Sequence, residues 1–183
     1  MSSNFPLYTI DNAPEKSRPT LAGLKEAFGF IPNVAGTMAA SPELISGFIG
    51  VFKSVHSGTF TEPQIQTLLL TNAVTNACTW AVAFHTTLSL QAGLAPADVQ
   101  AMRDKRLPAD PQLAALSQLA RQLIEQRGHL GDADVDRFAA AGFKREQALE
   151  VILVSAASTI TNYVGSLTQP PLEETFQPNA WTA

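Results

Sequence analysis

Residues 61–93 read TEPQIQTLLLTNAVTNACTWAVAFHTTLSLQAG, and this stretch decides the fold class. No Asp, Glu, Lys or Arg occurs between Pro63 and Ala97. Polar side chains interrupt the run too often for a lipid-facing helix, which needs about 20 predominantly apolar residues. We therefore expect two helices buried inside a folded protein, at 62–76 and 77–92.

Helix starts recur along the rest of the chain, whereas strand patterns are scarce. SPEL at Ser41 and DPQL at Asp110 each place a capping side chain before a proline at the first helical position. Thr61 and Gln64 form the pattern of a capping box. The run VILVSAAS after Glu150 is rich in β-branched residues, but its length and surroundings favour a buried helix. The sequence predicts an all-α fold, with further helices at 19–28, 34–40, 42–57, 96–104, 110–127, 132–141 and 145–166.

The composition indicates one globular domain, residues 1–183, that is large enough to bury its own core. Apolar residues make up 45% of the chain and charged residues 15%. The charged share is below the roughly 25% that is usual in soluble domains, which favours a homo-oligomer whose subunits cover part of one another. The net charge is −4, and no dense block of Lys or Arg is present, so nucleic acid is not expected as a partner.

Both ends of the chain have the composition of extended arms, residues 1–18 and the Pro-rich segment 169–183. Such arms commonly lie over a neighbouring subunit, where Trp181 would serve as an anchor. Packing of the tail over its own domain is the alternative. The N-terminus has no basic start followed by an apolar stretch, so we expect a cytoplasmic protein without a membrane segment.

The single cysteine, Cys78, lies seven residues before His85 in the second expected helix. On a continuous helix the two share a face with Ala81, whereas Trp80 lies on another face. A thiol and an imidazole on one face indicate redox or nucleophilic chemistry, but about two turns, roughly 10 Å, separate them. Water or another helix would have to mediate, and a structural role for each residue stays open. One cysteine and no HxxxH pattern predict neither a metal nor another cofactor.

Three long stretches of this chain resemble a known family: FGFIPNVAGTMAASPELISGFIGVF, the quoted run from Thr61, and the closing segment DADVDRFAAAGFKREQALEVILVSAASTITNYVGSLTQPPLEETFQPNAW. They look like the peroxidase-related branch of the alkylhydroperoxidase D (AhpD) and carboxymuconolactone decarboxylase superfamily. The resemblance implies an all-helical AhpD-like bundle that assembles as a trimer or a hexamer, and a dimer-based assembly stays open.

The resemblance also implies a site, and this sequence departs from it. Peroxidases of the family carry a Glu, a CxxC pair and a His, in which the second Cys attacks the peroxide. Carried over, Cys78 matches the resolving cysteine and His85 the histidine, whereas Ala81 stands in place of the attacking cysteine and Gln66 in place of the acid. Glu62, one turn before Gln66, is a displaced acid or simply complements the helix dipole. The decarboxylase branch carries an acidic residue where this chain has Ala81.

Three functions stay open. The first is a protein that has lost the dithiol peroxidase cycle and keeps a pocket for a small organic ligand. The second is a one-cysteine peroxidase or antioxidant enzyme that acts on a hydroperoxide through Cys78. The third is a cofactor-free decarboxylase, lyase or isomerase that uses His85 as acid or base. The residues of the expected site are Cys78, His85 and Gln66, with Ala81, Trp80 and Glu62 lining the pocket.

Overall fold

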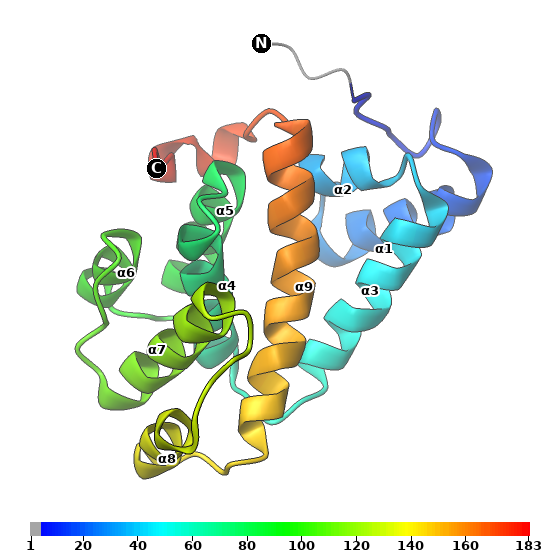
Figure 1. Ribbon diagram of the computed structural model, residues 1–183. Helices are drawn as coiled ribbons and strands as arrows, with labels where there is room; N and C mark the ends of the chain where they lie inside the picture. Colours follow the sequence, from blue (N-terminus) through cyan, green and yellow to red (C-terminus); the bar gives the residue numbers. More distant parts are fainter. Residues whose placement is uncertain (1–4) are drawn as a thin grey trace.

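The computed structural model describes residues 5–183, and within them every regular element is a helix, so the all-α prediction is confirmed (Figure 1). The α-helices are α1 (Arg18–Phe28), α2 (Asn33–Met38), α3 (Pro42–His56), α4 (Glu62–Thr75), α5 (Thr79–Gln91), α6 (Pro96–Arg103), α7 (Pro111–Glu125), α8 (Asp132–Ala140) and α9 (Gln147–Thr168). Two short 3-10 helices, η1 (Glu15–Ser17) and η2 (Glu174–Asn179), flank them.

The helix starts follow from local side-chain chemistry, as the sequence predicted. The Ser41 hydroxyl accepts a hydrogen bond from the Leu44 amide at 3.2 Å, and Asp110 caps α7 in the same way. At the start of α4 the Gln64 side chain accepts from the Thr61 amide at 2.9 Å. These bonds satisfy amide groups that the first turn of a helix leaves unpaired.

The start of α5 differs from the prediction. The helix begins at Thr79 rather than at residue 77, because Ala77 adopts a left-handed conformation with φ of 53° and Cys78 is extended. The Cys78 amide donates to the Ala73 carbonyl at 3.0 Å, which closes the end of α4 in a Schellman-type turn. Glycine usually occupies the left-handed position of this turn, so an alanine there gave no signal in the sequence.

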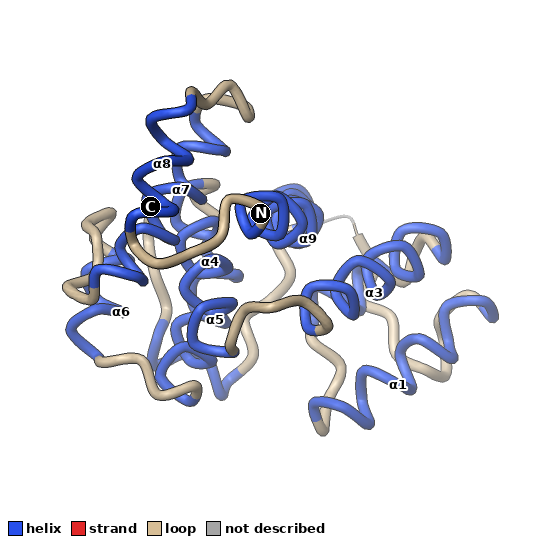
Figure 2. The backbone as a smooth tube through the Cα atoms, turned by 90° about the horizontal axis from the view of Figure 1, so that it is seen from below, coloured by secondary structure: helices blue, strands red, loops and turns tan. Residues whose placement is uncertain are grey.

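The long helix α9 forms the centre of the molecule, with α1–α3 on one side and α4–α8 on the other (Figures 1 and 2). By length and composition alone α9 is the one helix of residues 5–183 suited to crossing a membrane, with a mean hydropathy of 1.3. Helices α2, α3, α4, α5 and α7 all pack against it. A central helix of a packed bundle ordinarily has this composition.

The C-terminal segment, residues 169–183, packs against its own chain. The side-chain amide of Asn179 donates to the Thr87 hydroxyl of α5 at 2.9 Å. The Trp181 indole donates to the Arg103 carbonyl at the end of α6 at 3.3 Å. Phe176 of η2 is buried in the core. The segment expected as an arm therefore forms part of the wall around α5.

The N-terminal segment expected as an arm, residues 1–18, contains η1 and the first residue of α1. Its residues 1–4 lie outside the part of the chain that the structure describes. The Tyr8 amide donates to the Gly36 carbonyl of α2 at 3.2 Å, so the described part of this segment also contacts its own domain.

Candidate functional site

The central polar contact of the candidate site joins α5 to α4. Nδ1 of His85 lies 3.0 Å from Oε1 of Gln66, and both side chains are buried, with 5% and 3% exposure. The two helices pack closely because the uncharged run of the sequence lines both sides of their contact. Two of the three residues expected to be catalytic are thus in direct contact.

Glu62 connects this buried pair to the surface. Nε2 of Gln66 donates to Oε1 of Glu62 at 2.7 Å, and the other carboxylate oxygen lies 3.6 Å from Nε2 of His56. Nδ1 of His56 lies 3.0 Å from the Phe52 carbonyl. The sequence suggested Glu62 either as a displaced acid or as a partner of the helix dipole; its carboxylate contacts Gln66 and does not contact His85 directly.

His85 is held in its neutral form. Burial lowers the pKa of its imidazole to about 3, because a charged ring would lose its hydration in the apolar interior. Among residues 5–183 the hydrogen bond to Gln66, through Nδ1, is the one that the His85 ring makes. One ring nitrogen is therefore fixed by Gln66, and the other remains available.

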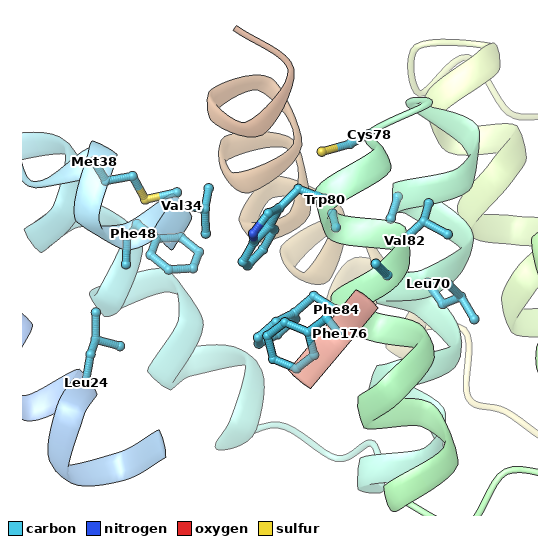
Figure 3. Packing of buried hydrophobic residues seen from close by; sticks show 14 of the residues in the cluster. Leu24, Val34, Met38, Phe48, Leu70, Cys78, Trp80, Val82, Phe84 and Phe176 are labelled. Carbon is cyan, nitrogen blue, oxygen red and sulfur yellow. The ribbon is translucent and has the colours of Figure 1, made fainter. Parts of the chain in front are cut away.

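An apolar cavity of about 50 Å³ adjoins His85 and lies between α5, α9 and the helix group α1–α3. Aromatic rings form much of its wall, and the indole of Trp80 stacks on Phe84 with centroids 4.9 Å apart (Figure 3). The side chains of Phe28 and Phe52 are only partly buried, so they form its outer edge. The side chains on its walls include Leu24, Phe28, Phe48, Phe52, Trp80, Phe84 and His85.

Cys78 does not share this cavity. The residue precedes α5 instead of lying within it, so the prediction that Cys78 and His85 occupy one helical face is wrong. Figure 3 shows its sulfur turned toward α9, where a Cβ added at Gly165 would lie 2.8 Å from Sγ. The side chain is 1% exposed, and burial raises the pKa of the thiol, an effect that backbone and Ser166 hydrogen bonds only partly oppose.

Ala81 and Trp80 differ in their relation to the cavity. Ala81 is fully buried and is absent from the cavity walls, whereas Trp80 lines them. Of the six residues expected at the site, the structure brings His85, Gln66, Glu62 and Trp80 into one connected group. Cys78 and Ala81 lie outside it.

Two residues of the C-terminal segment complete the site, and sequence reasoning missed both. Glu173 accepts hydrogen bonds from the Trp80 indole at 2.9 Å and from the Asn33 amide at 2.7 Å. Phe176 packs edge-on against Phe84 with centroids 5.0 Å apart. No local pattern could have identified them, because about ninety residues separate them from α5 along the chain.

Among residues 5–183 no group of three or more His, Cys, Asp and Glu side chains is arranged to hold a metal ion. The polar groups of the site are instead the connected side chains of His85, Gln66, Glu62 and His56. They form a row of hydrogen-bonding groups that runs from the surface to His85, which lines the cavity.

Comparison with known proteins identifies the fold. No protein-family model matches this sequence, and no curated protein matches it. Solved structures do match. An uncharacterised peroxidase-related protein with an AhpD core, from Ralstonia eutropha JMP134, has a TM-score of 0.84 and 18% identity, covering 96% of this chain and 95% of that chain.

Two further structures are similar. An uncharacterised peroxidase-related protein from Silicibacter sp. TM1040 has a TM-score of 0.79 and 16% identity, covering 94% of this chain and 92% of that chain. A variant of the debrominase Bmp8, in complex with 2,3,4-tribromopyrrole, has a TM-score of 0.77 and 18% identity, covering 98% of this chain and 96% of that chain. The protein therefore has the AhpD-like fold, as the resemblance in its sequence implied.

Proposed function

We propose that this AhpD-fold protein binds a small aromatic ligand that carries one N–H or O–H donor, and that it does not run a dithiol peroxidase cycle. The observation that carries the proposal is a neutral imidazole beside an otherwise apolar, aromatic cavity. Burial in such a cavity favours an apolar ring, and the free Nε2 of His85 accepts one hydrogen bond from it.

The size of the cavity limits the ligand. An apolar cavity of about 150 Å³ is known to bind benzene, whereas this one measures about 50 Å³. Binding of a five- or six-membered ring therefore requires the partly exposed side chains of Phe28 and Phe52 to turn outward. A neighbour of the same fold, the Bmp8 variant, is in complex with a ligand of this kind, a brominated pyrrole.

The chemistry of the site disfavours the two alternatives. A one-cysteine peroxidase needs an accessible thiolate, but Cys78 is buried and its pKa is raised. A decarboxylase, lyase or isomerase that uses His85 as acid or base needs an imidazole that titrates near neutral pH, but burial lowers this pKa to about 3. Recognition of a ligand requires neither property.

Tryptophan fluorescence can test the proposal, because Trp80 lines the cavity and Trp181 is the only other tryptophan. In a Trp181→Phe background we expect phenol and pyrrole to change the emission. Their methylated analogues, anisole and N-methylpyrrole, lack the donor and should bind about 2- to 10-fold more weakly, the range that corresponds to one net hydrogen bond.

The control for this titration is His85→Leu, which keeps the cavity apolar and removes the acceptor. In this variant the donor ligands and their methylated analogues should bind alike. The proposal fails if no ligand of either kind alters the Trp80 emission. It also fails if the methylated analogues bind the parent protein as tightly as phenol and pyrrole.

We further propose that the protein is a homo-oligomer in which a second copy covers α9. The apolar side chains of Leu149, Ile152, Tyr163 and Leu167 are exposed along this helix, with fractions of 68%, 49%, 65% and 71%. The steps between them are 3, 11 and 4 residues, which at 100° per residue places all four within about 60° on one face of the helix, and residues 151–168 contain no charged residue. A second α9 offers a matching row without like-charge repulsion. We also propose a cytoplasmic location for the protein.

Light scattering during size-exclusion chromatography measures this assembly. The parent is expected to elute as a dimer, trimer or hexamer, and the double variant Tyr163→Glu/Leu167→Glu as a smaller species, because buried carboxylates without partners are costly. Leu107→Glu, at another exposed leucine that lies away from α9, is the matched control and should leave the mass unchanged. A monomeric parent, or equal dissociation by Leu107→Glu, contradicts the proposal.

A further inference from the structure

The carboxylate of Glu62, at the protein surface, sets the hydrogen-bond orientation of the two buried side chains that follow it, Gln66 and His85. Glu62 is half exposed, and the oxygens of a carboxylate can only accept hydrogen bonds. The Gln66 atom that lies 2.7 Å from Glu62 must therefore be the amide nitrogen. This orientation of the amide follows from chemistry and does not depend on how its two similar ends were assigned.

Gln66 in turn constrains His85, the next residue inward. With its nitrogen on Glu62, Gln66 presents its carbonyl oxygen to His85, and a carbonyl oxygen accepts only. The ring atom that lies 3.0 Å away, Nδ1 of His85, must then carry the proton. A neutral imidazole has one N–H, so Nε2 is left with a lone pair and no proton.

We propose that Glu62 is a positioning residue: acting through Gln66, it fixes the Nδ1–H tautomer of His85 and thereby makes the cavity selective for ligands that donate a hydrogen bond. The part concerning ligands rests on the proposed function. The part concerning the tautomer stands without any ligand.

The surroundings hold this arrangement in place. Glu62 and Gln66 are one turn apart on α4, which brings their side chains together. Gln66 is 3% exposed, so water cannot replace a lost partner if its amide rotates. Rotation would turn its oxygen toward the Glu62 carboxylate and its nitrogen toward His85, and the bond to Glu62 would be lost. The second oxygen of Glu62 lies 3.6 Å from His56 of α3, which limits the movement of the carboxylate.

Replacing Glu62 by glutamine removes this directional constraint. A glutamine side chain can donate or accept, so Gln66 then satisfies its outer bond in either orientation. Both tautomers of His85 can then form a hydrogen bond with Gln66. In Glu62→Gln the tautomer is expected to change from a single Nδ1–H form to a mixture, and the affinity for phenol or pyrrole to fall by about 2- to 10-fold.

Nitrogen-15 NMR of the ligand-free protein at neutral pH tests the inference, because a protonated and a bare imidazole nitrogen have well-separated chemical shifts and the chain holds only three histidines. The parent should show one His85 form, protonated at Nδ1, and Glu62→Gln should show both forms. The matched control is Glu43→Gln, which removes another carboxylate from the first turn of a helix, α3, and should keep the single form.

A parent protonated at Nε2, or a Glu62→Gln variant that keeps only the Nδ1–H form, overturns the inference. The result is separable from the ligand titration. A mixture of tautomers in Glu62→Gln supports the positioning role even if no ligand binds the parent. An unchanged tautomer rejects that role even if the parent discriminates phenol from anisole.

Discussion

Lowering the pH from 7 to 3 is expected to reduce the free energy of unfolding by about 3 to 5 kcal/mol through His85 alone. Burial lowers the pKa of this imidazole to about 3 in the folded protein, whereas an exposed histidine of the unfolded chain titrates near 6.5. Below about pH 6.5 the unfolded chain therefore binds a proton that the folded protein does not. This stability is fully present above pH 6.5 and is lost as the pH falls toward 3.

Urea unfolding at several pH values between 7 and 4 measures this loss. His85→Gln cannot titrate, so its free energy of unfolding should fall less steeply over this range than that of the parent. The exposed His129 provides a control, because His129→Gln should keep the slope of the parent. Parallel curves for the parent and His85→Gln would show that His85 titrates as it does in the unfolded chain.

Cys78 is expected to react with alkylating and disulfide reagents roughly 100-fold or more slowly in the native protein than in the unfolded chain. Two effects act together. The side chain is 1% exposed, and burial raises the pKa of its thiol, so both access and the thiolate fraction are reduced. The same protein should show no Cys78-dependent reduction of peroxide.

Thiol titration with a chromogenic disulfide, with and without denaturant, gives the two rates. Ala109→Cys in a Cys78→Ala background provides the control, because residue 109 is exposed in the loop between α6 and α7, away from the α9 face that a second copy is proposed to cover. The introduced thiol should react rapidly in the native state. Fast native modification of Cys78 itself would restore the one-cysteine peroxidase as the leading function.

The helices could be predicted from the sequence because their signals are local. Capping residues such as Ser41 and Asp110 fix helix starts through bonds that span only a few residues. The contact between His85 and Gln66 was also foreseeable, since the resemblance to a known family placed both residues at one site. Local patterns predicted the fold class, and the resemblance placed His85 and Gln66 at one site.

The rest of the site depends on features that local patterns do not carry. The left-handed Ala77 moved Cys78 out of α5 and separated it from His85, although the spacing of seven residues indicated a shared face. The contact of Glu173 with Trp80 joins distant parts of the chain. The first is a local turn that the sequence did not signal, because alanine stands where glycine is usual, and the second is a tertiary contact.

The close contact between Cys78 and Gly165 bears on how such a sequence changes over evolutionary time. Because a methyl group at position 165 would collide with the sulfur, the two positions are coupled by volume. Alanine becomes acceptable at 165 when residue 78 is smaller, and the helix then gains a residue of better propensity. The buried sulfur of Cys78 thus occupies space beside Gly165, a packing role that requires no redox chemistry.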